Sequence, residues 1–411
     1  MRIISAWTRL ECHRRWRSLA ALALLVALAT ATVLTAAAGA RRGQTAFDRL
    51  WARTLPATVT VLPNQPHFDW SRIRALPEVS ALTTFAVAKF ALDGYQVATQ
   101  NNGLPPGDSQ VFRTIERPVV LQGRLLDPGR VDEVNVTALF PANYAKGVGD
   151  TLTLHLPSLQ QGQYYDPSSG LPPRGPKVRV RIVGVIRSPW FSDSPGSPGG
   201  VAPSPALVTH YRANLMGVRD DGFINALVRL KGGSAAIPRF RADLARVTGR
   251  SDIDIWDNLA NFGDPIRRVT GYEAACLLAF GLAALVAAFF LVGQSIARYA
   301  SATVSDLQIL RAPGMTPRQA TAAACAAPFL AAVAGATVGI AGAIVASGWM
   351  PIGMASLLEP HPGTSVDWLI LGAGWAAALL LVLAGSAVAA AAALAAGRIV
   401  RMRDGRAEGR P

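Results

Sequence analysis

The sequence predicts an α-helical membrane protein with four transmembrane helices, arranged as one plus three, and a large extracytoplasmic α+β domain between the first and second helices. Three observations lead to this fold class. One long apolar stretch lies near the start, three more lie close together near the end, and a long, mostly polar segment separates them. A helix rises about 1.5 Å per residue, so about 20 apolar residues cross a hydrocarbon core of about 30 Å.

The first predicted transmembrane helix, residues 19–38, contains no charged side chain. The arginines before it and the small residues Ala38-Gly39-Ala40 at its end also fit a cleaved signal peptide. A signal peptide has an apolar core of only roughly 7–15 residues, which favours an uncleaved signal anchor here. The other three predicted helices are 274–297, 320–350 and 368–396, and the last two are long enough to tilt or to extend into the interface.

The orientation follows from arginine and lysine near the membrane, which collect on the cytoplasmic side. The tail 397–411 and the start 1–18 are rich in arginine, whereas the connection 351–366 has neither arginine nor lysine. We therefore expect both termini and the connection 298–319 in the cytoplasm, and segments 40–270 and 351–366 outside. Arg41 and Arg42 at the outer end of the first helix weaken this signal. The Ala/Arg/Gly/Pro-rich composition suggests a bacterial chain, hence the bacterial inner (cell) membrane.

The two ends of the external segment have the same predicted order of strand, helix and strand. Ile237, Phe240, Leu244 and Val247 form one apolar stripe in the second predicted helix, and Pro238 is tolerated only in its first turn, so this helix starts nearer Ile237 than Ser234. Two such βαβ units, near 57–91 and 224–256, can share one split ferredoxin-like sheet. The predicted elements are strands 57–62, 79–91, 224–230 and 252–256 and helices 69–76 and 234–247.

A β-rich insert occupies about 105–220, between the two βαβ units. Segments 119–156 and 177–185 are rich in strand-forming residues, and alternation begins at Thr151 after a Gly-Asp turn. Segments 156–176 and 192–205 are loaded with Pro, Gly and Ser, and we expect them to be exposed loops.

Composition limits the partners. The net charge of +14 invites a nucleic-acid interpretation, but the cytoplasmic arginines follow from topology and no basic–aromatic alternation is present, so we predict no nucleic-acid partner. The external charges favour a solvated surface over a site for anionic lipid or cell-wall polymer. Cys12, Cys276 and Cys325 all lie outside the external domain, which therefore has no disulfide and depends on its core.

No catalytic motif is found. A P-loop requires a lysine after a glycine, and none of Lys89, Lys146, Lys177 and Lys231 follows one. The five histidines lack metal-ligand spacing, and no Gly-x-Ser-x-Gly motif is present. Residues 252–257 resemble the start of a calcium loop, but they lack its glycine and glutamate and alternate as a strand. We predict that the chain is not an enzyme and has no catalytic residues, metal or cofactor.

The predicted membrane helices are also poor in chemistry. Glu273 and Gln294 lie at the ends of the second helix, and the absence of charges near the midplane argues against an ion-coupled transporter or channel. Gly335, Gly339 and Gly342 form a small-residue face on the third helix. Small residues allow close helix approach, so this face serves either internal packing or a dimer contact.

The connection between the second and third helices carries a distinctive pattern. Thr316-Pro317 fits the cap and first position of a helix, and Gly314 fits a helix end. The segment resembles the FtsX-like permease family, which includes MacB-type ABC transporter subunits, although Pro313 replaces the hydrophobic residue usual in the family. The matching residues are Asp306, Leu310, Arg311, Ala312, Gly314, Arg318 and Gln319. In the external segment, 121–124, 132–136 and 149–152 are similar to the MacB-type periplasmic core.

This resemblance implies the permease subunit of an ABC transporter. A separate ATPase would dock on the cytoplasmic connection, and mechanotransmission would pass the motion to the external domain. The implied partners are that ATPase, a second permease copy or related half, and membrane lipid. The alternative is a membrane-anchored sensor or scaffold with an external ligand-binding domain and no ATPase; an external enzyme is a third class without a supporting motif. The implied ATPase contact comprises Asp306, Leu310, Arg311, Gly314 and Arg318.

Overall fold

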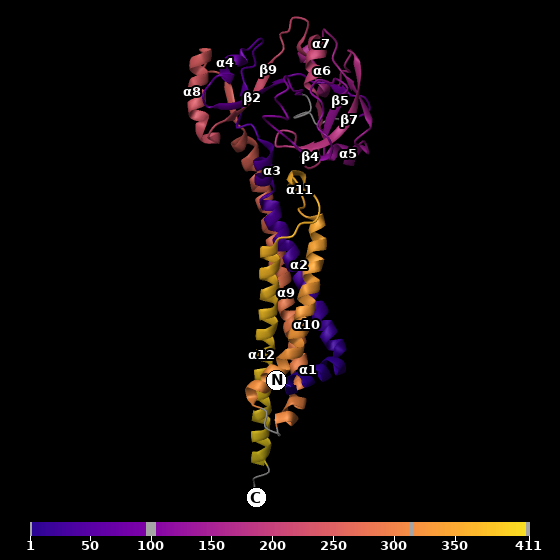
Figure 1. The fold of residues 1–411 in the computed structure, drawn as a ribbon, viewed down its shortest axis with the longest axis vertical. Helices are drawn as coiled ribbons and strands as arrows, with labels where there is room; N and C mark the ends of the chain where they lie inside the picture. Colours follow the sequence, from indigo (N-terminus) through magenta and orange to yellow (C-terminus); the bar gives the residue numbers. More distant parts are fainter. Residues whose placement is uncertain (1, 96–103, 312–315, 408–411) are drawn as a thin grey trace. The chain divides into compact units, whose positions relative to one another are not determined.

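The computed structural model describes residues 2–95, 104–311 and 316–407, and the chain forms two compact units (Figure 1). The helical unit comprises Met1–Arg42, Tyr272–Pro351 and Gly363–Pro411. The α+β unit comprises Gly43–Gly271 and Ile352–Pro362. The second segment of the α+β unit is short and comes from the connection between the last two long helices, a placement that matters for the site below.

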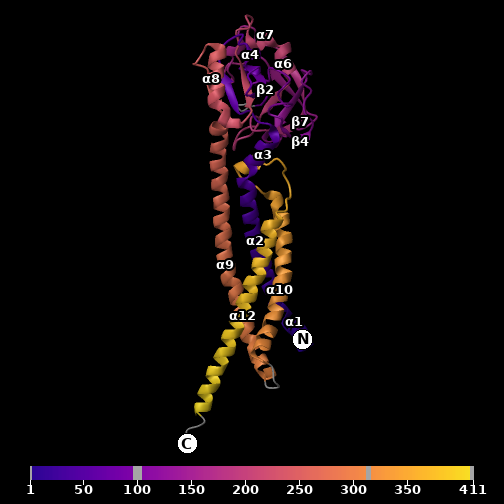
Figure 2. The same cartoon turned by 60° about the vertical axis from the view of Figure 1, so that its left-hand side comes forward.

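Within the described residues, four helices are long and apolar enough to cross a membrane, in agreement with the predicted number of such helices. α2 and α9 extend past both predicted ends and α12 past its predicted C-terminal end, whereas α10 starts three residues early and ends at Ala346, before the predicted residue 350. α10 packs against α12 and α1, and Figures 1 and 2 show α10 and α12 side by side. The helices are α1 Arg2–Arg14, α2 Trp16–Gln44, α9 Asp264–Arg311, α10 Pro317–Ala346 and α12 Trp368–Ala407.

The predicted split ferredoxin-like sheet is confirmed. Its strand order is β10-β1-β9-β2, and every neighbouring pair is antiparallel. α8 starts at Ile237 with Pro238 in its first turn, and its Phe240 and Leu244 pack with Ile73 of α4 against the sheet. The elements are β1 Val59–Leu62, α4 Trp70–Arg74, β2 Val79–Ala86, β9 Ile224–Leu230, α8 Ile237–Thr248 and β10 Asp254–Asp257.

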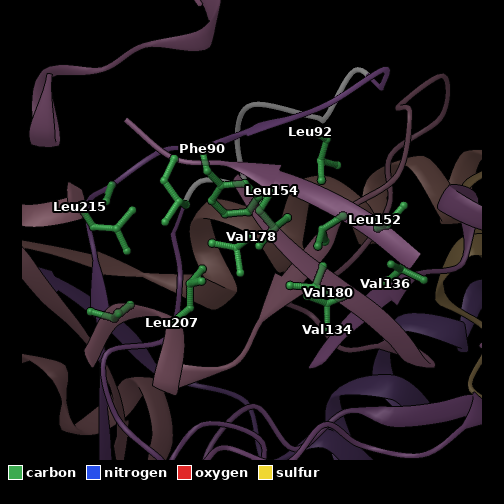
Figure 3. Packing of buried hydrophobic residues seen from close by; sticks show 14 of the residues in the cluster. Phe90, Leu92, Val134, Val136, Leu152, Leu154, Val178, Val180, Leu207 and Leu215 are labelled. Atoms are coloured by element: carbon green, nitrogen blue, oxygen red, sulfur yellow. The ribbon is translucent and has the colours of Figure 1, made fainter. Parts of the chain in front are cut away.

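The β-rich insert forms a second, six-stranded sheet in the order β3-β6-β7-β5-β8, with β4 paired to β7. Apolar side chains at alternate positions of β5, β6 and β7 gather with Leu207 and Leu215 into one core (Figure 3). The strands are β3 Ala91–Leu92, β4 Val119–Gly123, β5 Glu133–Thr137, β6 Thr151–His155, β7 Lys177–Arg187 and β8 Val201–Pro203. The helices are α5 Leu139–Tyr144, α6 Pro205–His210 and α7 Arg212–Met216.

Two predictions about the insert need correction. Its sheet begins at β3, before the predicted start near residue 105, because Ala91 and Leu92 pair with His155 and Leu154 of β6. The predicted exposed loop 192–205 contains β8 and the buried Asp193, whose carboxylate accepts hydrogen bonds from Thr137 Oγ1 and from Leu139 N at 2.8 Å. Glycine and proline mark irregular backbone, but irregular backbone is buried where its polar groups find partners.

Candidate functional site

The predicted coupling residues lie around the end of α9 and the start of α10. Asp306, Leu310 and Arg311 belong to the last turns of α9, which continues without a break to Arg311. No glycine or proline occurs between Arg298 and Arg311, so nothing ends the helix there, and the connection is shorter than the predicted 298–319.

Gly314 lies outside the described residues, as does Pro313. Arg318 is exposed in the first turn of α10. α9 and α10 thus place Asp306, Leu310, Arg311 and Arg318 on either side of one short connection.

The start of α10 is fixed by a capping box. The hydroxyl of Thr316 accepts a hydrogen bond from Gln319 N at 3.4 Å, and Gln319 Oε1 accepts one from Thr316 N at 3.1 Å. Pro317 occupies the first helical turn, where an N–H group would have no partner within the helix, so the missing N–H of proline costs nothing. This confirms the predicted helix start, and it gives Arg318 a defined backbone.

A buried polar cluster links Glu11 of α1, and Arg15 just after α1, to α9. Glu11 is buried, accepts a hydrogen bond from the hydroxyl of Tyr299 and lies 3.5 Å from Arg15 Nε. Arg15 also donates to the carbonyl oxygen of Ala302 at 2.8 Å, and Thr303 Oγ1 donates to the carbonyl oxygen of Tyr299 at 2.9 Å. Ala302 and Thr303 lie one turn before Asp306, so α1 holds the part of α9 that leads to Asp306.

Sequence reasoning missed this cluster. Residues 1–18 were predicted only as a cytoplasmic N-terminus, whereas Arg2–Arg14 form α1. The available signal was Glu11, the only acidic residue before the first apolar stretch. An isolated acid among arginines fits a solvated surface equally well, so its burial becomes evident only once α1 is placed against α9 and α10.

The glycine face of α10 lies against α2. A Cβ atom added to Gly339 would lie 2.7 Å from the carbonyl oxygen of Ala27, and one on Gly335 would collide with the carbonyl oxygen of Ala23. One on Gly342 would lie 3.3 Å from Ala31 Cβ. The three glycines therefore provide close packing within one chain, the first of the two predicted alternatives.

Arg41 and Arg42, which weakened the charge signal, have defined partners in the helical unit. Arg41 Nη1 lies 3.0 Å from Asp367 Oδ2, beside the start of α12. Arg42 Nη1 donates to the carbonyl oxygens of Ser347 and Gly363 at 3.1 and 2.9 Å. These contacts hold the ends of helices together. Arg41 and Arg42 therefore have a structural reason to lie at the C-terminal end of α2, whichever side of a membrane that end faces.

Residues 352–362, called here the docked loop, pack into the α+β unit. α11, Met354–Leu358, places Met354, Ala355 and Leu358 in one core with α3, Ala46–Thr54. The next residue, Glu359, is buried. Although the loop was predicted to be a simple external connection, its first half is an apolar helix that buries its side chains.

Glu359 fixes the docked loop by charge. Its carboxylate lies 2.6 Å from Arg49 Nη2 of α3 and accepts a hydrogen bond from His361 N at 3.2 Å. The guanidinium of Arg187, at the end of β7, donates to the backbone carbonyl of Glu359. Arg187 is itself buried, and this burial lowers its pKa while the charges of Asp193 and Glu359 raise it. Glu359 thus joins α3 to the loop through its carboxylate and the insert sheet to the loop through its backbone carbonyl.

Buried Glu116 is a second unanticipated carboxyl. It accepts hydrogen bonds from Ala57 N at 2.9 Å and Trp190 N at 3.3 Å, and it lies beside Ser188. Burial raises its pKa from 4.5 to about 7, against the opposing effect of these hydrogen bonds. Ala57 precedes β1 and Trp190 follows β7, so Glu116 ties the two sheets. These backbone donors satisfy the buried carboxyl and give it a structural role.

Among the described residues, no group of three His, Cys, Asp or Glu side chains is placed to hold a metal ion. β10 carries the calcium-like segment, and it is a paired strand whose residues alternate in exposure. No protein-family model and no curated protein matches this sequence. Three features remain from which a function can be inferred: the connection between α9 and α10, the polar cluster of α1 and α9, and the docked loop.

Proposed function

We propose that this chain is the permease subunit of an ABC transporter. It couples ATP hydrolysis by a separate ATPase to movement of its α+β unit, for export or extraction of a substrate or for control of an external partner. In this proposal the four long helices span a bacterial inner membrane, both termini are cytoplasmic, and the α+β unit is outside. Two permease copies, or this chain and a related half, work together.

The docked loop is the observation that carries the proposal. The chain passes between its four long helices and the α+β unit at three places: α2 into α3, the continuous helix α9, and the docked loop. A soluble domain that needs only an anchor requires one attachment. Three attachments, one of them secured by buried Glu359, suit a domain that moves when the helices move.

The opposite ends of the same helices suit an ATPase contact. α9 carries Asp306, Leu310 and Arg311, and α10 begins with a capped turn that bears exposed Arg318. α10 is also the helix that leads into the docked loop. A push on this connection would therefore act directly on two of the three attachments.

The test is co-purification of the full chain, from membranes, with an ABC ATPase. We expect Arg311→Glu and Gly314→Trp each to reduce ATPase binding and permease-stimulated ATP hydrolysis. Arg298→Glu is the matched control, since Arg298 is exposed on α9 more than three turns earlier and should have little effect.

Two outcomes contradict parts of the proposal. If Arg311→Glu and Gly314→Trp leave both binding and stimulated hydrolysis intact, this connection is not the coupling surface. If no ATPase binds and the chain instead retains a ligand or an external enzyme, the membrane-anchored sensor or scaffold replaces the transporter.

A further inference from the structure

A groove of about 620 Å³ lies between α1 and α10, within the helical unit. Its α10 wall is apolar. Leu330 in this wall is 51% exposed, and α10 is one of the four described helices long enough to span a membrane. The volume is in the range of small-molecule sites. The lining residues that matter here are Arg9, Cys12 and His13 of α1 and Ala326, Phe329 and Leu330 of α10.

Two basic side chains stand at the α1 wall of this groove. Arg9 and His13 are four residues apart on a helix, so they lie on the same face, and both are exposed. Among the side chains that the structure describes, neither has a hydrogen bond or an ion pair. Arg15 on the same segment is instead bound to Glu11 and to the carbonyl oxygen of Ala302.

We propose that this groove binds one anionic phospholipid, with an acyl chain along Phe329 and Leu330 and the phosphate at the guanidinium of Arg9. An apolar wall beside unpartnered basic groups matches a molecule that has a hydrocarbon chain and a negative head. A soluble anion would make no use of the apolar wall, and an apolar helix would leave Arg9 without a counter-charge. The inference rests on the membrane location of α10 that the proposed function assumes, but not on any ATPase.

The α1 segment supplies the long-range attraction. Five arginines and one glutamate precede Leu19. Basic residues beside a membrane helix attract anionic lipid by about 1 kcal/mol each, equivalent to about a fivefold preference. The groove adds a fixed position, because the Glu11 cluster holds α1 against α9 while Cys12 packs with the core of the helical unit.

The experiment uses the full chain in nanodiscs that contain phosphatidylglycerol and phosphatidylcholine, one of them carrying a photoactivatable diazirine in its acyl chain. Cross-linked peptides are mapped by mass spectrometry. We expect the peptide with Phe329 and Leu330 to be labelled about fivefold more by the phosphatidylglycerol probe than by the phosphatidylcholine probe. Arg9→Gln should remove this preference, and Arg9→Lys should retain most of it.

Arg17→Gln is the matched control, because it removes one charge from the same segment but Arg17 lies over the Trp16 ring, not in the groove lining. Leu330→Trp fills the apolar wall and should reduce labelling by both probes. Size-exclusion profiles establish that the variants fold. Equal labelling by the two lipids in the wild-type chain overturns the proposal. So does an equal loss in Arg9→Gln and Arg17→Gln, which would show a diffuse surface potential.

Discussion

The buried carboxyl of Glu116 makes the stability of the α+β unit depend on pH in an unusual direction. Its ordinary pKa is 4.5, and burial raises this to about 7 in the folded chain. Between these two pH values the folded chain therefore holds a proton that the unfolded chain has released. Where the unfolded state binds fewer protons than the folded state, stability falls as the pH rises. The contribution of Glu116 is present below pH about 4.5, is lost as the pH approaches about 7, and does not change above that.

The size of this effect follows from the two pKa values. A pKa difference of one corresponds to about 1.4 kcal/mol, so the rise from 4.5 to about 7 amounts to about 3 kcal/mol of unfolding free energy. Glu116→Gln removes the titration and keeps one acceptor oxygen, whereas the carboxylate uses Oε1 for Ala57 N and Oε2 for Trp190 N, so one backbone N–H loses its acceptor in the variant. We expect the variant to be less stable than the wild type at acidic pH and to lose most of this pH dependence.

Urea unfolding of the full chain in detergent, on both sides of this pH interval, measures the difference between wild type and variant. Glu133→Gln is the matched control with the opposite sign. The hydrogen bond from Arg124 is the largest influence on the pKa of Glu133 and lowers it, so its contribution is present above pH about 4.5 and is lost on acidification. If Glu116→Gln shows the same loss of stability from acidic to neutral pH as the wild type, Glu116 is not the group responsible and the reasoning fails.

Three further substitutions test the framework of the site. Thr316→Ala removes the α10 cap, which should cost about 1 kcal/mol and speed amide exchange in the first turn of α10, whereas unfolding elsewhere is unchanged. Gly339→Leu overpacks the contact with α2 and should cost about 1–3 kcal/mol in thermal unfolding; Gly293→Leu, with open space around it, should not. Glu359→Ala removes the carboxylate that pairs with Arg49 and should destabilise the α+β unit by about 1–3 kcal/mol in urea, and an unchanged midpoint would contradict the role assigned to the docked loop.

Much of the α+β fold is predictable because it depends on local pattern. The stripe of Phe240 and Leu244 and the position of Pro238 define α8 without tertiary information. The repeated strand–helix–strand order then leaves few ways to form one sheet. The boundary of the insert was harder, because β3 has only two residues and is a strand only through its pairing with β6. No periodicity can identify an element of that length.

The site was predictable only where a local rule applies. The Thr316-Pro317 cap is written in adjacent residues, and the structure contains it. The partners Glu11 and Tyr299 are separated by 288 residues, and Arg49 and Glu359 by 310. A buried acid has the same sequence signature as an exposed one until its partner is placed. The same limit applies to the lipid groove, since nothing local connects Arg9 with Leu330.

The distribution of polar contacts has a mechanical consequence for the proposed transporter. α2 and α10 pack through small residues, with Gly335 and Gly339 against the α2 backbone, so dispersion forces hold this part of the contact, whereas the hydrogen bond from Arg42 to the Ser347 carbonyl lies at its end. Within the α+β unit, Glu116 and Glu359 each join elements far apart in sequence by buried, directional bonds. A buried charge that loses its partner is costly, whereas a small sliding of apolar surfaces is not. Strain applied at the connection of α9 and α10 would therefore be relieved by movement between helices, and the α+β unit would move without changing its internal fold.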